Sequence, residues 1–162
     1  MENYHPRRHD REIEDKNEIE RVLKNGKYAI IALAKENDPY IVTLSYGYDN
    51  KNNSLYFHCA LRGQKTDYLK TNSSVCATII EDHGYQKTKC EHSYASLIIR
   101  GELNIVEDLQ EKKRGLNVLL NHLEEDPEPI LKRNIINEKS YDKVIILRLK
   151  INNIIGKQNY NK

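Results

Sequence analysis

Short apolar or alternating segments, separated by polar turns, recur along most of the chain and predict β-strands. Residues 40–48 alternate with a period of two, so Val42 and Leu44 fall on an apolar face. Thr43 and Ser45 fall on the opposite face, which is small and polar. The connections are typical of hairpins rather than crossover helices, which predicts an antiparallel barrel or an α+β fold. The six expected strands cover residues 27–34, 40–48, 55–60, 75–81, 94–106 and 143–151.

Apolar residues with helical spacing mark two longer segments, 15–25 and 108–123. Each opens with an acidic residue that can cap the helix and a Glu three residues later, which is the spacing of a capping box. Gly26 follows the first helix, and we expect it in the left-handed conformation that ends many helices. A short helix is expected at 64–71, and residues 82–93 are expected to be irregular. The capping pairs are Asp15 with Glu18 and Asp108 with Glu111.

Length and composition predict one domain over residues 1–162, with an N-terminal arm at 1–14 and a C-terminal tail at 152–162. Hydrophobic residues make up 38% of the chain and charged residues 31%. No apolar run approaches the ~20 residues that span a bilayer, so we expect no membrane partner. The N-terminus has no apolar segment behind its basic residues, unlike a signal peptide. The three cysteines do not form a disulfide framework, which favours a reducing, cytoplasmic location.

Positive charge is concentrated near the end of the chain, although the formal net charge is only +2. Residues 132–162 carry eight Lys or Arg against two acidic residues, a net charge of +6. A nucleic-acid-binding protein usually gathers its positive charge on one face. A solvated strand and tail explain this segment better, and six charges would suit a small phosphorylated ligand equally well. We therefore expect no nucleic-acid partner.

Gly63 and Lys65 stand where a predicted strand ends and a helix begins. Free backbone N–H groups and the charge of Lys65 could hold a phosphate there, although the spacing of a Walker loop is absent. A Gly-x-Lys at the start of a helix is common, so this feature alone is a weak signal. Just before it, His58 and Cys59 are successive strand residues, so their side chains should point to opposite faces and cannot easily converge on one ion.

Cys90, Glu91 and His92, with His83 nearby, form a better metal cluster by position, because ligands on an irregular loop can converge. The group lacks a second Cys-x-x-Cys or His-x-x-x-His pair, so a polar surface loop explains it better and we expect no metal. Cys59 and Cys76 are expected to be small core residues rather than nucleophiles.

Taken in order, several segments resemble the flavin-nucleotide-binding split-barrel proteins related to pyridoxamine 5′-phosphate oxidase, most closely their nitroimidazole-resistance branch. The two longest are residues 39–49 (PYIVTLSYGYD) and 55–65 (LYFHCALRGQK). No single motif is decisive, but the ordered series is specific. The shorter segments are residues 8–13, 19–26, 94–101, 105–108 and 156–157.

The resemblance implies a mainly β fold with peripheral helices, a six-stranded antiparallel split β-barrel. It further implies a homodimer with an FMN in each of two clefts between protomers. His58 would be the catalytic residue near the substrate, and Lys65 would hold the flavin phosphate. The strand face that carries Thr43, Ser45 and Gly47 has only small side chains, which would let a flat ring lie against the backbone. The positions that the resemblance assigns to the cofactor are Val42, Thr43, Leu44, Ser45, His58, Cys59, Ala60, Gly63, Gln64, Lys65 and Ser96.

The chain also departs from the vitamin-producing oxidases of this family. Those enzymes carry a basic strand at the place where this chain has Val42 and Tyr46. They also have a C-terminal signature that contains Trp, and this chain has no Trp. We therefore do not expect oxidation of pyridoxamine 5′-phosphate. Gln64 stands where the family usually has Arg, so phosphate binding should depend on Lys65 and the basic C-terminal segment. FAD would also fit a more open phosphate end.

Three functions are compatible with this resemblance. The leading hypothesis is an FMN-dependent oxidoreductase that reduces small nitroaromatic compounds of the 5-nitroimidazole type, in which the flavin carries the electrons. The second is a flavin-binding or storage module without efficient catalysis. The third is haem-related chemistry, in which His83 or His92 would ligate iron.

Overall fold

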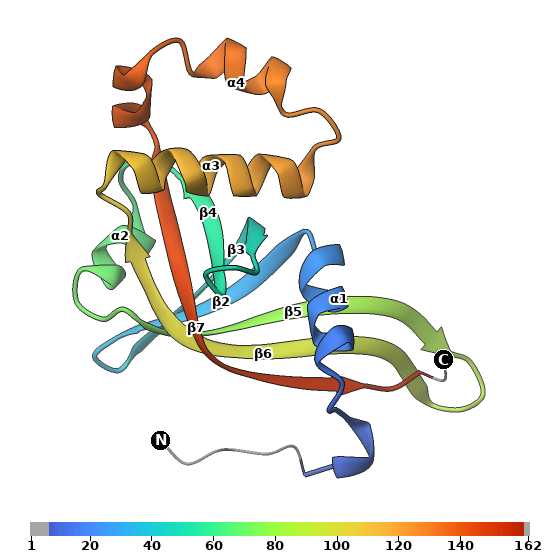
Figure 1. The fold of residues 1–162 in the computed structure, drawn as a ribbon. Helices are drawn as coiled ribbons and strands as arrows, with labels where there is room; N and C mark the ends of the chain where they lie inside the picture. Colours follow the sequence, from blue (N-terminus) through green and yellow to red (C-terminus); the bar gives the residue numbers. More distant parts are fainter. Residues whose placement is uncertain (1–6, 161–162) are drawn as a thin grey trace.

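The computed structural model describes residues 7–160, which form a β-barrel with helices packed outside it (Figure 1). The strands are β1 (Glu12–Ile13), β2 (Tyr28–Lys35), β3 (Asp38–Asp49), β4 (Ser54–Cys59), β5 (Ser74–Gln86), β6 (Glu91–Ile105) and β7 (Ile145–Gln158). The α-helices are α1 (Lys16–Asn25), α2 (Gln64–Leu69), α3 (Leu109–Leu123) and α4 (Glu128–Asn134). Two 3₁₀ turns, His9–Arg11 and Glu138–Lys143, complete the described chain.

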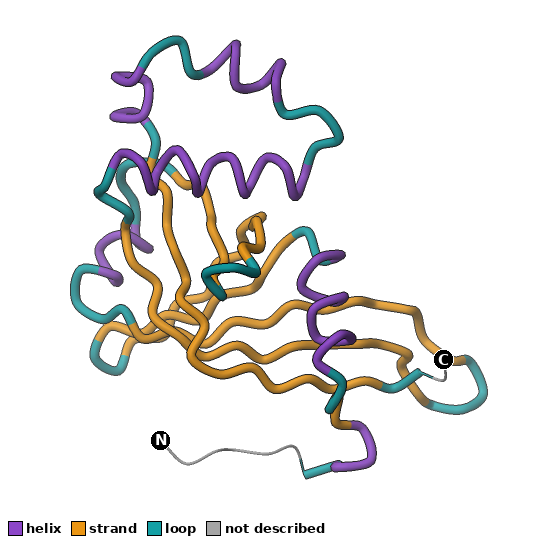
Figure 2. Tube along the Cα trace, in the orientation of Figure 1, coloured by secondary structure: helices purple, strands orange, loops and turns teal. Residues whose placement is uncertain are grey.

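The strands are antiparallel and run in the order β1-β7-β4-β3-β2-β5-β6, and a further pairing of β6 with β7 closes the barrel. Six strands therefore form the barrel, which confirms the predicted fold class, and the two-residue β1 adds a short edge beside β7. Strands β2 and β5 pair over only three residues, Ile30–Ala32 with Cys76–Thr78. Figure 2 shows the strands of the barrel in orange and the helices in purple.

Two polar segments that we expected to be irregular are strands. β5 continues to Gln86 and β6 begins at Glu91, so most of residues 82–93 form a hairpin. β7 continues to Gln158, so the tail expected from residue 152 begins later. Both expectations relied on apolar alternation. These strand ends have little buried surface, and backbone hydrogen bonds to neighbouring strands define them instead.

The helix at α1 is confirmed, but the predicted conformation of Gly26 is wrong. The Asp15 side chain caps the helix by accepting a hydrogen bond from the Asn17 N–H. Gly26 has φ −62° and ψ 143°, which is extended backbone that any residue can adopt. A Cβ at this position would lie 2.4 Å from Tyr46 Oη and 2.7 Å from Ile79 Cγ2. Close packing, and not a left-handed turn, explains the glycine.

The core fills the barrel with aliphatic and aromatic side chains from the inner faces of its strands. Val22 and Leu23 of α1 join this core and are fully buried. A second apolar cluster lies outside the barrel, between β4, β7, α3 and the turn before β7. Its buried members are Tyr56, Val106, Leu116, Tyr141 and Ile146.

Helix α3 crosses the outer face of β3 and β4 at unusually close range. A Cβ at Gly47 would lie 2.5 Å from Leu119 Cα and 2.6 Å from Leu119 N, and one at Gly115 would lie 2.6 Å from Tyr56 Cδ1. Gly47 therefore allows the backbones of β3 and α3 to approach, and Gly115 makes room for the side chain of Tyr56. At the start of α3 the Asp108 side chain accepts from the Glu111 N–H, which confirms the predicted cap. The carboxylate of Glu111 also accepts from Arg148 Nη1 at 2.6 Å.

We expect Gly47→Ala to lower the free energy of unfolding by about 1–3 kcal/mol, because the new methyl group would meet the backbone of α3, which cannot yield as a side chain can. Chemical denaturation measures this change. Ser45→Ala is the matched control on the same strand and face, where the side chain is exposed, and it should change stability by less than ~0.5 kcal/mol. Equal stabilities of the two variants would contradict the close packing of α3.

Candidate functional site

The last two residues of β4 point to opposite sides of the barrel wall, as strand alternation requires. Cys59 is buried within the barrel core. His58 follows Tyr56 on the outer face and is more exposed than its neighbours in the strand. Of His58 and Cys59, only His58 can contact a ligand outside the barrel with its side chain. Cys59 could contribute only its backbone.

The outer face of β3 continues this surface. Gly47 pairs with Tyr56 and Tyr46 with Phe57, so Ser45 lies next along the face that also carries His58. Thr43 and Ser45 are exposed on this face. Beyond Tyr46 no further pairing of β3 with β4 is found among the described residues, so this part of β3 has β2 on one edge and a free edge on the other.

The structure specifies how three positions on β3 could take part in a site, and it changes the expected role of one of them, Gly47. Val42 and Leu44 turn inward and pack against the barrel core, so only their backbone faces the outer surface. Gly47 is buried under α3 and does not belong to the open part of this face. Helix packing, which the strand sequence alone does not reveal, explains why Gly47 is small.

The loop after β4 leads to α2 through Ala60, which is exposed, and Gly63. Gly63 has φ +151°, a conformation that L side chains rarely adopt, and a Cβ there would meet nothing within 4 Å. Its carbonyl accepts hydrogen bonds from Thr66 Oγ1 at 2.6 Å and Thr66 N at 3.0 Å. The backbone at Gly63 therefore remains open to the solvent, with room for a ligand beside it.

Helix α2 is tied to the start of β3 by side chains. Gln64 Nε2 donates to Tyr68 Oη at 3.5 Å, and Tyr68 Oη donates in turn to the carboxylate of Asp38. Gln64 therefore interacts within the protein, while the neighbouring Lys65 is half-buried. Because α2 has only six residues, its dipole is small. The positive charge here comes from the side chains of the exposed Arg62 and the half-buried Lys65.

The charge of Lys65 reaches both residues at the end of β4. Burial lowers the pKa of His58, and the positive charge of Lys65 lowers it further. Burial raises the pKa of Cys59, and Lys65 acts in the opposite direction. His58 is consequently neutral at pH 7, and Cys59 is a thiol rather than a reactive thiolate. The structure thus brings together His58, Lys65 and the exposed face of β3.

Ser96, the remaining predicted cofactor contact, does not join this group within one chain. It pairs with Ile80 of β5 and with Lys157 of β7. His58 pairs with Ile146, eleven residues earlier on β7, which corresponds to roughly 35 Å of strand. A single chain therefore places Ser96 far from Lys65.

The loop that contains Cys90 carries no metal site. His92 Nε2 lies 2.7 Å from Asp82 Oδ1, and the ring of His83 packs on that of Tyr160 with centroids 4.8 Å apart. Within residues 7–160, no group of three or more His, Cys, Asp or Glu is placed to hold an ion.

A cavity of about 380 Å³ beside His58 was not predicted from the sequence. It lies between α3 and α4, and apolar side chains make up most of its wall. The signal in the sequence is the set of apolar positions in the short segment 130–136, three of which line the cavity, although nothing in the sequence shows which surface they face. The lining residues are His58, Leu116, Leu119, Leu120, Ile130, Leu131, Asn134, Ile135 and Val144.

None of the helices between residues 7 and 160 has both the length and the apolar character needed to span a bilayer.

The closed barrel with its short β2–β5 pairing and outer α3 defines a split-barrel protein. The chain belongs to the pyridoxamine 5′-phosphate oxidase family, because the model of that family matches residues 15–158. The resemblance seen in the sequence is thereby confirmed. No curated protein matches the sequence.

Three solved structures illustrate the similarity. A candidate 5-nitroimidazole antibiotic resistance protein from Bacteroides thetaiotaomicron is 26% identical, with a TM-score of 0.76 over 90% of this chain and 85% of that one. The flavocytochrome Anf3 from Azotobacter vinelandii is 15% identical, with a TM-score of 0.80 over 96% of this chain and 72% of that one. An FAD-binding protein from Mesorhizobium loti is 20% identical, with a TM-score of 0.68 over 93% and 98%. At these identities, the last two show only the shared fold.

We expect Lys65→Gln to raise the pKa of His58 towards its ordinary value, because the variant removes one of the two causes that lower it. Burial, the larger cause, remains, so the pKa should stay below that of an exposed histidine. An NMR titration of the His58 ring measures the change. Since the unfolded chain binds this proton more tightly than the folded one, the contribution of His58 to stability is complete above pH ~6.5 and is lost as the pH falls.

Lys70→Gln provides the control for this titration. Lys70 follows α2, is exposed and forms an ion pair with Asp67 at 3.5 Å. Its replacement should leave the pKa of His58 unchanged. If Lys65→Gln also left it unchanged, the two side chains would not belong to one electrostatic site.

Proposed function

We propose that this protein is a flavin-nucleotide-binding oxidoreductase that holds FMN at the end of β4 and reduces small nitroaromatic compounds. The observation that carries this proposal is the meeting of His58, Gly63 and Lys65 beside the open face of β3, in a chain that belongs to the pyridoxamine 5′-phosphate oxidase family. The similarity to a candidate nitroimidazole-resistance protein supports the choice of substrate class.

The residues present fit a flavin nucleotide. Thr43 and Ser45 are small and exposed, so a flat ring could approach the backbone of β3 closely. Space is open around Gly63, where a phosphate could reach the loop. Lys65 is half-buried, and a charged hydrogen bond to phosphate is stronger there than at a fully exposed site.

Each residue then has a separate task. Lys65 binds the phosphate, with the backbone of Ala60 and Gly63 beside it. The backbone of Val42 and Leu44, together with Thr43 and Ser45, supports the ring. When bound, the flavin supplies the electron-transfer chemistry that no side chain of the protein can provide.

His58 is suited to orient a substrate rather than to neutralise a charge. Its lowered pKa keeps the ring uncharged at pH 7, so one nitrogen can donate a hydrogen bond while the other accepts one. Cys59 remains a buried thiol and takes no part in this chemistry. We therefore assign to His58 the contact with the polar group of the substrate.

The structure does not favour haem chemistry at His83 or His92. His92 is bonded to Asp82, and His83 lies 3.7 Å from the carboxylate of Glu81 and packs on Tyr160. Both rings are thus engaged by neighbouring side chains.

We further propose that two chains pair through the outer faces of β2, β3, β5 and β6. Large apolar side chains are exposed on these faces: Tyr28 (51%), Ile41 (65%), Ile80 (44%) and Ile98 (44%). Exposed apolar residues that gather on one surface are typical of protein interfaces. Ser96, which pairs with Ile80, lies within this surface and could then contact a flavin held by the other copy.

We expect Lys65→Ala to weaken FMN binding by about 1.5–3 kcal/mol, the range for a hydrogen bond to a charged group. Riboflavin, which has no phosphate, should bind the variant and the parent equally. Quenching of flavin fluorescence during titration measures both affinities.

The control variant for flavin binding is Lys70→Ala, whose side chain is exposed and paired with Asp67. It should bind FMN as the parent does. If the parent bound neither FMN nor FAD, the proposed function would be wrong, and an equal loss of riboflavin and FMN binding in Lys65→Ala would remove Lys65 from the phosphate site.

Ile98→Asp should convert the dimer into a monomer, because it places a charge in the centre of the proposed interface. Light scattering after size-exclusion chromatography measures the mass. Ile136→Asp is the control, since Ile136 is 81% exposed and lies outside the interface. A parent protein that is monomeric at micromolar concentration would contradict the interface.

A further inference from the structure

The cavity between α3 and α4 is a pocket open to solvent on one side, and not an internal packing defect. Protein interiors are packed as densely as organic crystals, and an engineered apolar cavity of ~150 Å³ in another protein binds benzene. The cavity here has a volume of about 380 Å³. It therefore has room for a molecule with one or two aromatic rings.

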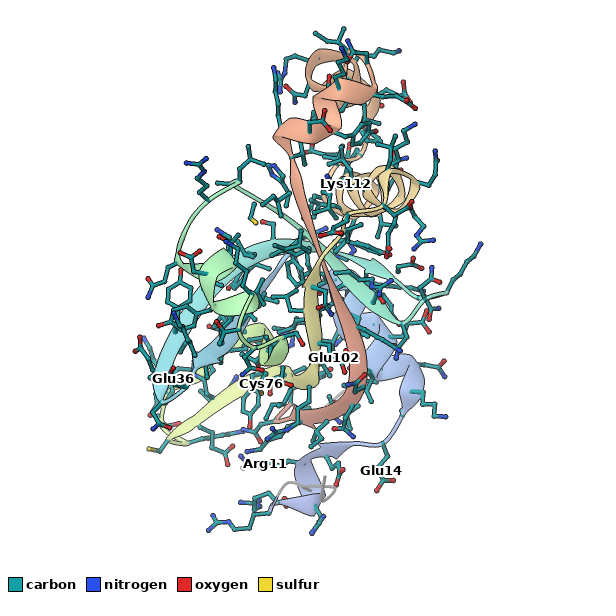
Figure 3. The ribbon with its side chains drawn as sticks, turned by 90° about the vertical axis from the view of Figure 1, so that its left-hand side faces the viewer. Arg11, Glu14, Glu36, Cys76, Glu102 and Lys112 are labelled. Carbon is teal, nitrogen blue, oxygen red and sulfur yellow. The ribbon has the colours of Figure 1, made fainter. Side chains whose placement is uncertain are left out.

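Helix α4 covers this cavity and packs only in part against the second apolar cluster, through Leu131. Seen nearly along α3 in Figure 3, where Lys112 marks that helix, α4 lies on the side of α3 that faces away from the barrel. None of its residues is buried, yet Ile130 and Leu131 line the cavity, together with Ile135 directly after the helix. The protein covers these apolar side chains only in part, so a ligand in the cavity could complete their packing.

The cavity wall contains no charged side chain. Apart from the apolar residues, only His58 and Asn134 line it. Lys132 and Arg133 of α4 are exposed and do not belong to the lining. Because burial and Lys65 lower the pKa of His58, its ring is neutral at pH 7. An anion that entered would lose its hydration without gaining a charged partner.

His58 is the residue that the cavity shares with the proposed flavin site. It lies on the outer face that continues to Ser45, it is within the electrostatic reach of Lys65, and it forms part of the cavity wall. A molecule in the cavity that contacts this ring would lie at the border of the flavin site.

We propose that the cavity between α3 and α4 is the substrate site, and that it selects small uncharged aromatic molecules whose polar substituent forms a hydrogen bond with His58. The apolar side chains of α3 and α4 enclose the rings, and Asn134 offers a second polar contact. The inference rests on the proposed function only in naming the bound molecule as the substrate.

Nitrobenzene and benzoate provide a matched pair of probes, because they have the same shape and differ in charge. Saturation-transfer NMR with the protein as purified, at pH 7.5, measures the binding of each. We expect nitrobenzene to bind at least tenfold more tightly than benzoate and to shift the ring signals of His58. Equal binding of both probes, tighter binding of benzoate, or binding of neither would overturn the proposal.

Two variants locate the bound probe. Ile135→Trp fills the cavity and should weaken nitrobenzene binding at least tenfold. Ile136→Trp adds the same side chain at the next residue, which is 81% exposed and outside the lining, and should leave binding unchanged. If both variants bound nitrobenzene like the parent, the probe would lie elsewhere. The comparison of the two probes on the parent protein does not depend on the folding of either variant.

The result separates this inference from the proposed function. A protein that retains FMN but does not distinguish the probes has a flavin site and no such substrate cavity. A protein that binds nitrobenzene beside His58 but takes up no flavin has the binding cavity without the proposed chemistry.

Discussion

The close packing of α3 against the barrel determines how the whole outer surface is used. Gly47 brings the backbone of β3 against that of α3, and Gly115 leaves room on α3 for the side chains of Tyr56 and Ile146. Tyr56 is buried at this contact. As a result, α3 covers one end of the outer face of β3 and β4 and leaves the adjoining part, with Thr43, Ser45 and His58, open.

The same contact gives His58 two neighbouring environments. Leu116 and Leu119 of α3 form one side of the cavity under α4, and His58 closes its end near the barrel. Towards the other side lie Lys65 and the open face of β3. A neutral imidazole suits both environments. It can donate one hydrogen bond and accept another, and an apolar ligand that covers it does not bury a charge. The proposed cofactor site and the proposed substrate site thus meet at one residue.

Most of the barrel could be predicted because its strands alternate clearly between buried and exposed positions. β3 is an example, with Val42, Leu44 and Tyr46 turned inward. The prediction was wrong where backbone pairing defines a strand without burial, as in the hairpin of β5 and β6 and at the end of β7. It was also wrong for Gly26, because a local turn preference was used to explain a residue that packs against Tyr46 and Ile79. The order of the motifs predicted His58 and Lys65 as members of the candidate site, whereas the distance of Ser96 from Lys65 follows from the register of β6 and β7.

The sequence by itself determined the two capped helices, the barrel strands, the opposite orientations of His58 and Cys59, and the likeness to a flavin-binding family. These depend on local periodicity and on the order of short motifs, both of which are properties of the chain alone. Only the tertiary structure decided that Gly47 lies under α3, that burial and Lys65 together keep His58 neutral, and that α4 covers a cavity. Each of these depends on a contact between segments far apart in the chain, and a pattern of residues does not state which distant surface a side chain will meet.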